Sequence, residues 1–370
     1  MKLNGIRLFK KGRIAAALAV VLAIPVAEAD VLRIGVATAG GGDPVTFSGS
    51  TLGIVRNQQL LEKAFAGTGT EVQWFFFKGA GPAVNEAFSN QQLDFAYQGD
   101  LPAVVGRSNG LDTKLLAALG VRANLYLAVP KGSSVKTIED LKGKKVAIFR
   151  GTNGHLVMIN LLAEHGLTER DIKAINLDTG SSQAALISNG VDAAFGGREL
   201  FKLRDKGLID IVYNNPEQDV RYTRQTALVV RGDYEKEHPD KVQKVVDTLV
   251  DAAKWTSDDS HRDEVFAEWA KSNDPADSLR ADFTGVPLRD RASPLVDNFL
   301  LSRYQAVADQ AKEEKLIRRP VSIDGWFETS YLHQALKAKG LENYWTPYGP
   351  DGEQPAGNAV AVTTTSKQGS

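Results

Sequence analysis

Strand-like and helix-like segments alternate through the first part of the chain, and this alternation restricts the fold more than any other feature. Short apolar runs such as VLRIGVA (31–37) and VQWFFF (72–77) predict buried strands, whereas LGIVRNQQLLEKAF (52–65) has the apolar spacing of a helix. Strands that alternate with helices form mostly parallel sheets covered by helices. From residue 240 onwards the predicted segments, such as 240–256 and 293–316, are all helical. The sequence therefore predicts two α/β lobes, with trailing helices, that face each other across a cleft.

The N-terminal segment has the three parts of a secretory signal peptide. Residues 1–13 contain five basic residues and no acid, residues 14–26 are almost wholly apolar, and the small-residue site AEA follows, ending at Ala29. The apolar run is shorter than the roughly 20 residues that a membrane-spanning helix needs. We therefore expect residues 1–29 to be removed on export. A retained membrane anchor is the alternative.

Composition excludes several classes of protein. Cysteine is absent from the 370 residues, which excludes disulfides and cysteine-ligated metals, so the fold must depend on its apolar core. Without its basic N-terminal segment the chain is mildly acidic, which argues against a nucleic-acid partner. The five histidines follow no metal-binding spacing, and the nucleophile motif Gly-x-Ser-x-Gly is missing. We therefore expect a binding protein rather than an enzyme, with no cofactor and no metal.

The residues that follow each predicted strand are the candidate ligand contacts, because ligands of open α/β sheets bind beyond the carboxyl ends of the strands. The first such loop, TAGGGDPVTFSGST (38–51), contains three consecutive glycines, whose backbone adopts conformations that other residues resist. Its glycine spacing matches neither a phosphate-binding P-loop nor a dinucleotide loop. Phe47, Ser48 and backbone N–H groups of the loop are candidates for ligand contact. A surface insertion without a ligand is the alternative.

The sequence FRGTNGH, which ends at His155, lies between a predicted strand and a predicted helix and is a candidate anion site. Thr152 or Asn153 can cap the helix, while the free N–H groups of its first turn attract negative charge. The glycines, including Gly154, allow the backbone to approach a ligand closely. Arg150 and His155 can each add a donor. The alternative is a capped turn without a ligand, which any strand-to-helix connection needs.

Further strand ends carry polar side chains. Gly99 and Asp100 follow a predicted strand, and Asp100 either meets a ligand or caps the next helix. Arg198, in the sequence GGREL, either makes a bidentate contact with an oxyanion or lies in solvent. The chain then returns to the first lobe through RYTRQTALVV, where we expect Arg224 and Gln225 to face the cleft.

Several segments, in this order, resemble the periplasmic solute-binding proteins of ABC importers for aliphatic sulfonates, taurine and nitrate. The similarity spans most of the chain after the signal peptide and is most specific in GDLPA and in IEDLKGKKVAIFRGTNGH. The resemblance implies a type II periplasmic-binding-protein fold of class α/β, with two lobes, each a mostly parallel sheet flanked by helices, joined by a two-stranded hinge. It implies that residues 30–125 and 225–345 form lobe 1, residues 126–224 form lobe 2, and residues 346–370 form a flexible tail.

The same resemblance implies that the mature protein lies in the periplasm, where a monomer captures a small organic anion and delivers it to an ABC permease in the inner membrane for sulfur acquisition. It places four parts of the chain at the ligand: the first strand-end loop, Gly99 with Asp100, the turn at 151–155 and the segment after Phe195. In that segment Gly197, Arg198 and Glu199 replace an aromatic residue and an Asp-Pro pair that similar sulfonate binders often have. The lost aromatic group and the added positive charge favour a larger anion, such as an aryl or substituted alkyl sulfonate or a sulfate ester. Binding of taurine, nitrate or an aromatic carboxylate, or an exported enzyme on this fold, are the alternatives.

Overall fold

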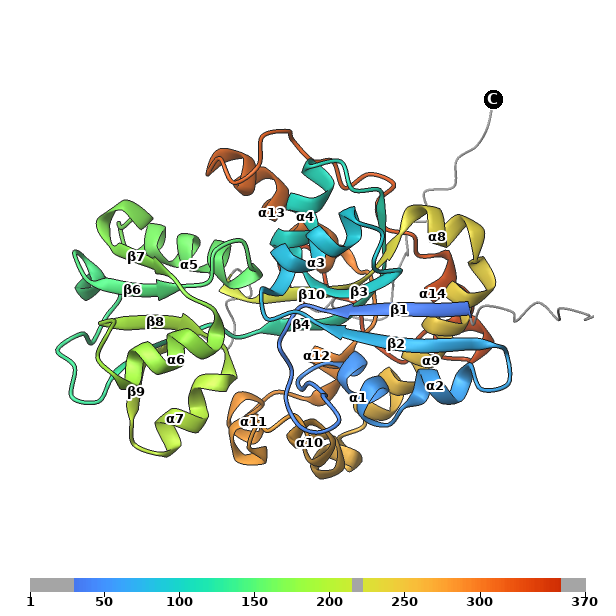
Figure 1. Ribbon diagram of the computed structural model, residues 1–370, viewed down its shortest axis with the longest axis horizontal. Helices are drawn as coiled ribbons and strands as arrows, with labels where there is room; N and C mark the ends of the chain where they lie inside the picture. Colours follow the sequence, from blue (N-terminus) through green and yellow to red (C-terminus); the bar gives the residue numbers. More distant parts are fainter. Residues whose placement is uncertain (1–29, 215–221, 354–370) are drawn as a thin grey trace, which may run out of the picture.

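The computed structural model of the protein describes residues 30–214 and 222–353 (Figure 1). The predicted signal peptide, residues 1–29, and the last part of the predicted tail lie outside these residues. Within them, strands and helices alternate as the sequence predicts, up to the run of helices in the C-terminal part. No helix of the described part combines the length and the apolar composition that crossing a membrane requires.

The described strands form two five-stranded sheets (Figure 1). We call the first sheet with its helices lobe 1 and the second sheet with its helices lobe 2. In spatial order, the sheet of lobe 1 consists of β2 (Thr70–Phe76), β1 (Asp30–Val36), β3 (Phe95–Gly99), β10 (Arg224–Arg231) and β4 (Thr113–Ala123). The sheet of lobe 2 consists of β7 (Lys173–Asn176), β6 (Lys145–Ile148), β8 (Ala193–Gly196), β5 (Tyr126–Pro130) and β9 (Ile209–Asn214).

The predicted fold class is confirmed: in each sheet four of the five strands run in the same direction, and one strand runs antiparallel to its neighbours. In lobe 1, β1 runs parallel to β2 and β3, whereas β10 runs antiparallel to β3 and β4. In lobe 2, β6 runs parallel to β7 and β8, whereas β5 runs antiparallel to β8 and β9. The antiparallel strands are β5 and β10, and each of them follows a strand of the other lobe, β4 and β9 respectively. Neighbouring parallel strands need a crossover connection, usually a helix, within one lobe, and β5 and β10 have no such helix before them in the described part of the chain.

The chain passes between the lobes at two neighbouring points. β4 ends at Ala123 and β5 begins at Tyr126, which is the first connection. Ala123 is paired with Arg224, the first residue of β10. The two connections therefore lie side by side, in the arrangement of a two-stranded hinge (Figure 1).

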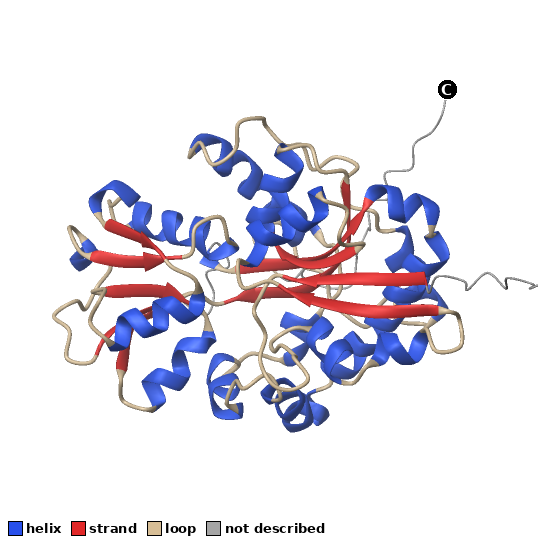
Figure 2. Ribbon diagram, in the orientation of Figure 1, coloured by secondary structure: helices blue, strands red, loops and turns tan. Residues whose placement is uncertain are grey.

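Helices cover both faces of each sheet (Figure 2). In lobe 2, α5 (Asn153–Glu164) lies on one face, and α6 (Thr179–Ile187) and α7 (Phe201–Asp205) lie on the other. One face of lobe 1 carries α3 (Ala80–Ser89), α4 (Asp100–Ser108) and α13 (Asn298–Glu313). The remaining helices are α1 (Thr51–Asn57), α2 (Leu60–Ala64), α8 (Gly232–Glu237), α9 (Pro239–Thr256), α10 (Arg262–Ala270), α11 (Ala276–Asp282), α12 (Leu288–Ala292) and α14 (Ser330–Ala338).

Two predicted boundaries differ from the structure. The predicted helix at 52–65 is divided into α1 and α2, because Gln59 has a left-handed backbone conformation, with φ of 54°, that interrupts the helical hydrogen bonds. The first residues of the predicted flexible tail are packed. Tyr348 is 9% exposed, and its N–H group donates to Asp297 Oδ2 at 2.9 Å. Contacts with α13 that are distant in sequence thus extend the ordered chain beyond the predicted boundary at residue 346.

The lobes contact each other on two sides that differ in chemistry. On the side that we call the apolar side, one cluster of buried residues contains Val104 of α4, Leu156 of α5 and Leu300 of α13. On the side that we call the polar side, the hydroxyl group of Tyr126 in β5 donates to Asp282 Oδ1 in α11 at 2.5 Å. α11 comes from the part of the chain assigned to lobe 1, but it also packs against lobe 2.

Candidate functional site

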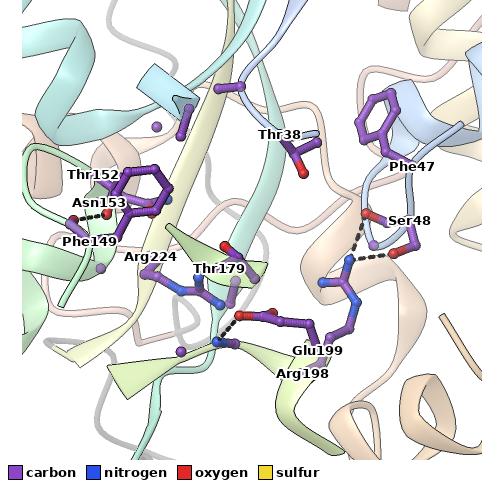
Figure 3. Close-up of a pocket in the computed structure, with 18 of the residues that line it drawn as sticks. Thr38, Phe47, Ser48, Phe149, Thr152, Asn153, Thr179, Arg198, Glu199 and Arg224 are labelled. Atoms are coloured by element: carbon purple, nitrogen blue, oxygen red, sulfur yellow. Dashed lines mark hydrogen bonds between the residues drawn. The ribbon is translucent and has the colours of Figure 1, made fainter. Parts of the chain in front are cut away.

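A cavity of about 580 Å³ lies between the lobes (Figure 3). Its lining includes the loop after β1, the end of β3, the turn after β6, the segment after β8 and the start of β10. Sites for small organic molecules usually enclose roughly 300–1,000 Å³. The cavity therefore has room for one such molecule, and it lies at strand ends, where ligands of α/β proteins are expected.

Aromatic side chains form an apolar wall of the cavity. Phe47, from the loop after β1, is 3% exposed, and its ring centroid lies 6.1 Å from that of Phe76 and 5.3 Å from that of Tyr97. Phe149 and Phe195 line the cavity from lobe 2. These rings offer apolar surface against which the organic part of a ligand can pack.

The glycine-rich loop after β1 is part of the cavity lining. A Cβ atom at Gly41 would lie 2.1 Å from the carbonyl oxygen of Ser272, so only glycine allows the loop to approach the turn after α10 this closely. This packing brings Phe47 and Ser48 to the cavity, where both line its wall. The loop thus has a defined position beside the cavity, although the sequence left a surface insertion open.

The turn after β6 brings two free backbone N–H groups to the cavity. Gly151 has φ of 76°, a left-handed conformation that lets the chain turn from β6 into α5. Thr152 is the N-cap residue of α5, which begins at Asn153. No described residue accepts a hydrogen bond from the N–H groups of Asn153 and Gly154. These groups and the helix dipole are therefore available to an anion.

His155 supports this turn through its own hydrogen bonds. The residue is 3% exposed, its Nδ1 accepts the Gly151 N–H group at 3.3 Å, and its Nε2 lies 3.0 Å from Glu169 Oε2. Arg150, the other candidate donor, is bound by Glu169, with its Nε at 3.0 Å from Oε1. Burial raises the pKa of Glu169, but hydrogen bonds from His155 and Arg150 outweigh burial and hold that pKa below its ordinary value. Both ring nitrogens of His155 thus have protein partners.

Side chains of the turn also connect it to lobe 1. Thr152 Oγ1 donates to the Phe149 carbonyl oxygen at 2.7 Å. Asn153 Nδ2 donates to the Gln225 carbonyl oxygen at 3.4 Å, and a Cβ atom at Gly99 would lie 3.0 Å from the Asn153 side chain. The turn of lobe 2 is therefore held against β3 and β10 of lobe 1. The predicted residues that line the cavity here are Gly99, Thr152, Asn153, Gly154 and His155.

Arg198 lines the cavity, but lobe 1 holds its guanidinium group. Its Nη2 donates to the Ser48 carbonyl oxygen at 2.8 Å and to Ser48 Oγ at 2.6 Å (Figure 3). Its Nε lies 3.9 Å from Asp274 Oδ2, and Ser48 Oγ donates to the same carboxylate. Burial lowers the pKa of Arg198, but nearby carboxylates, with Asp274 first, outweigh burial and raise that pKa above its ordinary value. Arg198 is therefore a contact between the lobes on the polar side.

Arg224 and Gln225, neighbours in β10, face opposite sides of the strand, as strand geometry requires. Arg224 lines the cavity, its Nη2 donates to the Asn124 carbonyl oxygen at 2.6 Å, and its Nε has no hydrogen-bond partner in the described part. Gln225 is 0% exposed, and its Oε1 accepts the Arg122 N–H group at 3.0 Å. Of the two residues, only Arg224 reaches the cavity.

Asp100 lies behind the cavity wall and serves the backbone. It is 3% exposed, its Oδ1 accepts the Leu101 N–H group at 2.7 Å, and its Oδ2 accepts the Gln225 N–H group at 3.2 Å. Burial raises the pKa of Asp100 to about 7, despite these hydrogen bonds and the nearby Arg224. The structure therefore favours the role at the helix terminus over the role at the ligand that the sequence also left open.

Charged residues that the sequence reasoning missed complete the lining. Arg291 Nη1 donates to Asp282 Oδ2 at 2.8 Å, and both residues come from helices whose position over the cavity depends on tertiary packing. Lys78 Nζ lies 3.6 Å from Asp178 Oδ2. Since these two residues follow β2 and β7, the strand-end rule that identified the other candidates also covers them.

The arrangement is suited to holding an organic anion. Free N–H groups and the Arg224 guanidinium can receive the charged group, while the aromatic wall can contact the organic group. Among the described residues, no group of three or more His, Cys, Asp or Glu side chains is placed to hold a metal ion.

Comparisons with known proteins agree with this site. The family described as NMT1/THI5 like matches residues 65–261, which is more than half of the chain. A solved structure from Methylobacillus flagellatus KT, named as the periplasmic sulfonate-binding protein of a sulfonate ABC transporter, is 30% identical. It superposes with a TM-score of 0.73 over 86% of this chain and 98% of that chain.

Two sequence relatives extend the comparison. A protein of Bacillus subtilis (strain 168), named an aliphatic sulfonates-binding protein, is 25% identical over 291 residues, which are 78% of this chain and 85% of the relative. The 2'-hydroxybiphenyl-2-sulfinate desulfinase of Rhodococcus erythropolis is 24% identical over 164 residues, which are 43% of each chain. Of these two sequence similarities, the longer one is to a binding protein and the shorter one is to an enzyme.

Proposed function

The chain belongs to the NMT1/THI5-like family, and from this premise we propose that it is the substrate-binding protein of an ABC importer for organic oxyanions. Relatives with extensive similarity are named as sulfonate-binding proteins, one of them as periplasmic. The ligand is an alkyl or aryl sulfonate or a sulfate ester, captured in the periplasm and delivered to an inner-membrane permease for sulfur acquisition.

One observation carries this proposal: the free N–H groups of Asn153 and Gly154 lie in the same cavity as the Arg224 guanidinium, which forms no ion pair in the described part and donates only to a backbone carbonyl group there. Helix N-terminal N–H groups and arginine are the groups that proteins use for oxyanions. The three oxygens of a sulfonate can accept from both sources at once. The aromatic wall with Phe47 and Phe149 then contacts the organic group.

The size of the cavity supports an anion larger than ethanesulfonate. About 580 Å³ is available, and Gly196 and Gly197 add no side chain to the lining where the segment leaves β8. A ligand with only two carbon atoms would leave apolar surface of the wall in contact with water. An aryl or substituted alkyl group would instead bury that surface and gain the associated hydrophobic free energy.

Capture follows from the contacts between the lobes. An open form admits the ligand, and closure surrounds the anion with fixed donors in place of water. Arg198 of lobe 2 contacts Ser48 of lobe 1 at the cavity, so closing the lobes forms this contact as it encloses the ligand. The permease then receives the ligand when the lobes reopen.

A thermal-shift screen followed by calorimetry tests the proposal. The panel contains alkyl and aryl sulfonates, sulfate esters, taurine, nitrate and aromatic carboxylates. A bound ligand at 100 times its Kd stabilises the folded state by about 2.7 kcal/mol, which raises Tm. We expect sulfonates or sulfate esters to raise Tm and nitrate to leave it unchanged. A response to nitrate or carboxylates alone would assign the site to one of those anions instead.

The similarity to a desulfinase makes an enzyme the second candidate. Incubation of the purified protein with aryl sulfinates and sulfate esters, followed by assay of released sulfite and sulfate, separates capture from catalysis. We expect binding without release. Release above the rate of the buffer alone, abolished by Arg224→Ala, would identify an enzyme on this fold.

A further inference from the structure

Most charged side chains of the cavity lining are neutralised by another side chain. Three ion pairs lie in the lining itself: Arg291–Asp282 at 2.8 Å, Lys78–Asp178 at 3.6 Å and Arg198–Asp274 at 3.9 Å. Within the described ranges, this leaves Glu199, Lys202 and Arg224 without an ion pair. Of these three residues, Glu199 and Arg224 lie on either side of Gly197.

The two charged groups lie on either side of Gly197 without forming an ion pair. A Cβ atom at Gly197 would lie 2.6 Å from Arg224 Nη2 and 2.6 Å from Glu199 Oε2. Glu199 Oε1 accepts the Gly197 N–H group at 2.7 Å, which fixes the carboxylate, whereas Oε2 receives no hydrogen bond from the described residues. Figure 3 shows the carboxylate and the guanidinium in the same part of the cavity. Because residue 197 has no side chain, the space between them stays open.

A carboxylate in this position opposes a simple anion. Two negative charges repel each other more strongly in a cavity shielded from water than in solution. A ligand that places a hydrogen-bond donor beside Glu199 and its sulfonate beside Arg224 turns the repulsion into attraction and satisfies both groups. Glu199 therefore favours ligands whose organic part carries a hydrogen-bond donor, and Arg224 favours ligands that carry an anionic group.

We propose that Glu199 and Arg224 form a two-part subsite across Gly197 that selects sulfonates bearing an amine or hydroxyl donor near the sulfonate group. This inference rests on the proposed function, since it names the substrate class of the same cavity. If Glu199 only accepts the Gly197 N–H group and does not contact the ligand, ligands with and without the amine or hydroxyl donor bind with equal affinity.

Matched ligands test this subsite by calorimetry. The probes are 3-aminopropane-1-sulfonate, 3-hydroxypropane-1-sulfonate and butane-1-sulfonate, which place an ammonium, a hydroxyl or a methyl group at the same position. A second pair, 3-aminobenzenesulfonate and 3-methylbenzenesulfonate, covers aryl ligands. We expect the native protein to bind the ammonium ligand roughly tenfold or more tightly than the methyl ligand, as for a charge-assisted hydrogen bond.

Variants at Glu199 isolate its contribution. In Glu199→Gln the amide oxygen can still accept the Gly197 N–H group, so we expect an unchanged Tm. The preference for ammonium over methyl should fall below about threefold, since the charge-assisted bond is lost. Glu313→Gln, which removes one negative charge from an exposed position outside the lining, is the control and should keep the full preference.

Gly197→Ala provides an independent variant. The backbone there, with φ of −97° and ψ of −159°, is allowed for alanine, so folding is preserved. The added methyl group must displace one of the two charged groups, and we expect both ligands to bind roughly tenfold more weakly.

The possible results separate the two proposals. If every matched pair binds equally to the native protein, or if Glu199→Gln keeps the preference, the subsite is wrong and the proposed function stands. If no sulfonate or sulfate ester of the wider panel binds, the proposed function is wrong and the subsite falls with it.

Discussion

The two sides on which the lobes meet differ in the energy that separating them would cost. On the apolar side, Leu156 of α5 shares a buried cluster with Val104 and Leu300 of lobe 1. On the polar side, Arg198 and Tyr126 of lobe 2 form hydrogen bonds with lobe 1 and α11. Such hydrogen bonds to charged groups are exchanged for bonds to water at a net cost of about 1.5–3 kcal/mol each, whereas exposed apolar surface costs about 25 cal/mol per Å². The apolar side therefore stabilises the molecule, while the few hydrogen bonds of the polar side can form and break as the lobes close and open.

The apolar side should show the largest effect on stability. Leu156→Ala removes a side chain that is 2% exposed and leaves a cavity in the apolar cluster that residues of both lobes share. We expect the free energy of unfolding to fall by about 2–5 kcal/mol, measured by urea denaturation. Ile187→Ala, at a residue that is 47% exposed, is the control and should change it by less than about 0.5 kcal/mol. A loss below 1 kcal/mol for Leu156→Ala would show that the apolar side does not hold the lobes.

The buried carboxyl group of Asp100 should make stability depend on pH. Its pKa is raised from 3.8 to about 7 by burial, so between these values the folded state binds a proton that the unfolded state does not. Stability should therefore fall as pH rises from about 4 to 7, by up to about 4 kcal/mol. Asp100→Asn lacks this titration, so its stability relative to the native protein should increase over the same range. The Tm of the native protein and of Asp100→Asn is measured at pH 5, 6, 7 and 8. If the two Tm values change in parallel, the raised pKa of Asp100 is contradicted.

At the cavity, Arg224 should dominate the binding energy. Arg224→Ala removes a guanidinium group that lines the cavity and forms no ion pair in the described part, and we expect sulfonate binding to weaken by about 1.5–3 kcal/mol, as for a lost charged hydrogen bond. Calorimetry with the tightest ligand of the screen measures the change. Arg170→Ala, at an exposed arginine outside the lining, should bind as the native protein does. If Arg224→Ala binds the ligand with the affinity of the native protein, the anion is bound in another part of the cavity.

The polar side should show the smallest effect and the clearest coupling. Because Arg198 is already held by Ser48 and Asp274, we expect Arg198→Ala to weaken binding by only about 0.5–1.5 kcal/mol, through looser closure. Ser48→Ala should have a similar effect, and the double variant should cost less than the sum. Strictly additive losses would mean that each residue contacts the ligand independently. A loss above 3 kcal/mol for Arg198→Ala alone would make it the main anion receptor.

Much of the site could be predicted because its geometry is local. The FRGTNGH turn combines a left-handed glycine with the first turn of α5, and both depend on residues that are close in sequence. The rule that ligands lie at strand ends likewise needs only the order of strands and helices. The role of His155 was less predictable, because its partner Glu169 lies 14 residues away in another element. Nothing in the turn itself indicates that partner.

The sequence by itself determined the α/β class, the approximate places of the elements and the turn with free N–H groups, because apolar periodicity and helix termini are properties of short segments. Only the tertiary structure decided which arginine of the cavity lining lacks an ion pair in the described part. Strand alternation places Arg224 and Gln225 on opposite faces, but packing decides which face meets the cavity. Arg198 finds its partner in Ser48, 150 residues earlier in the chain. Charges are paired through space, so folding rather than residue type decides which of them a ligand can reach.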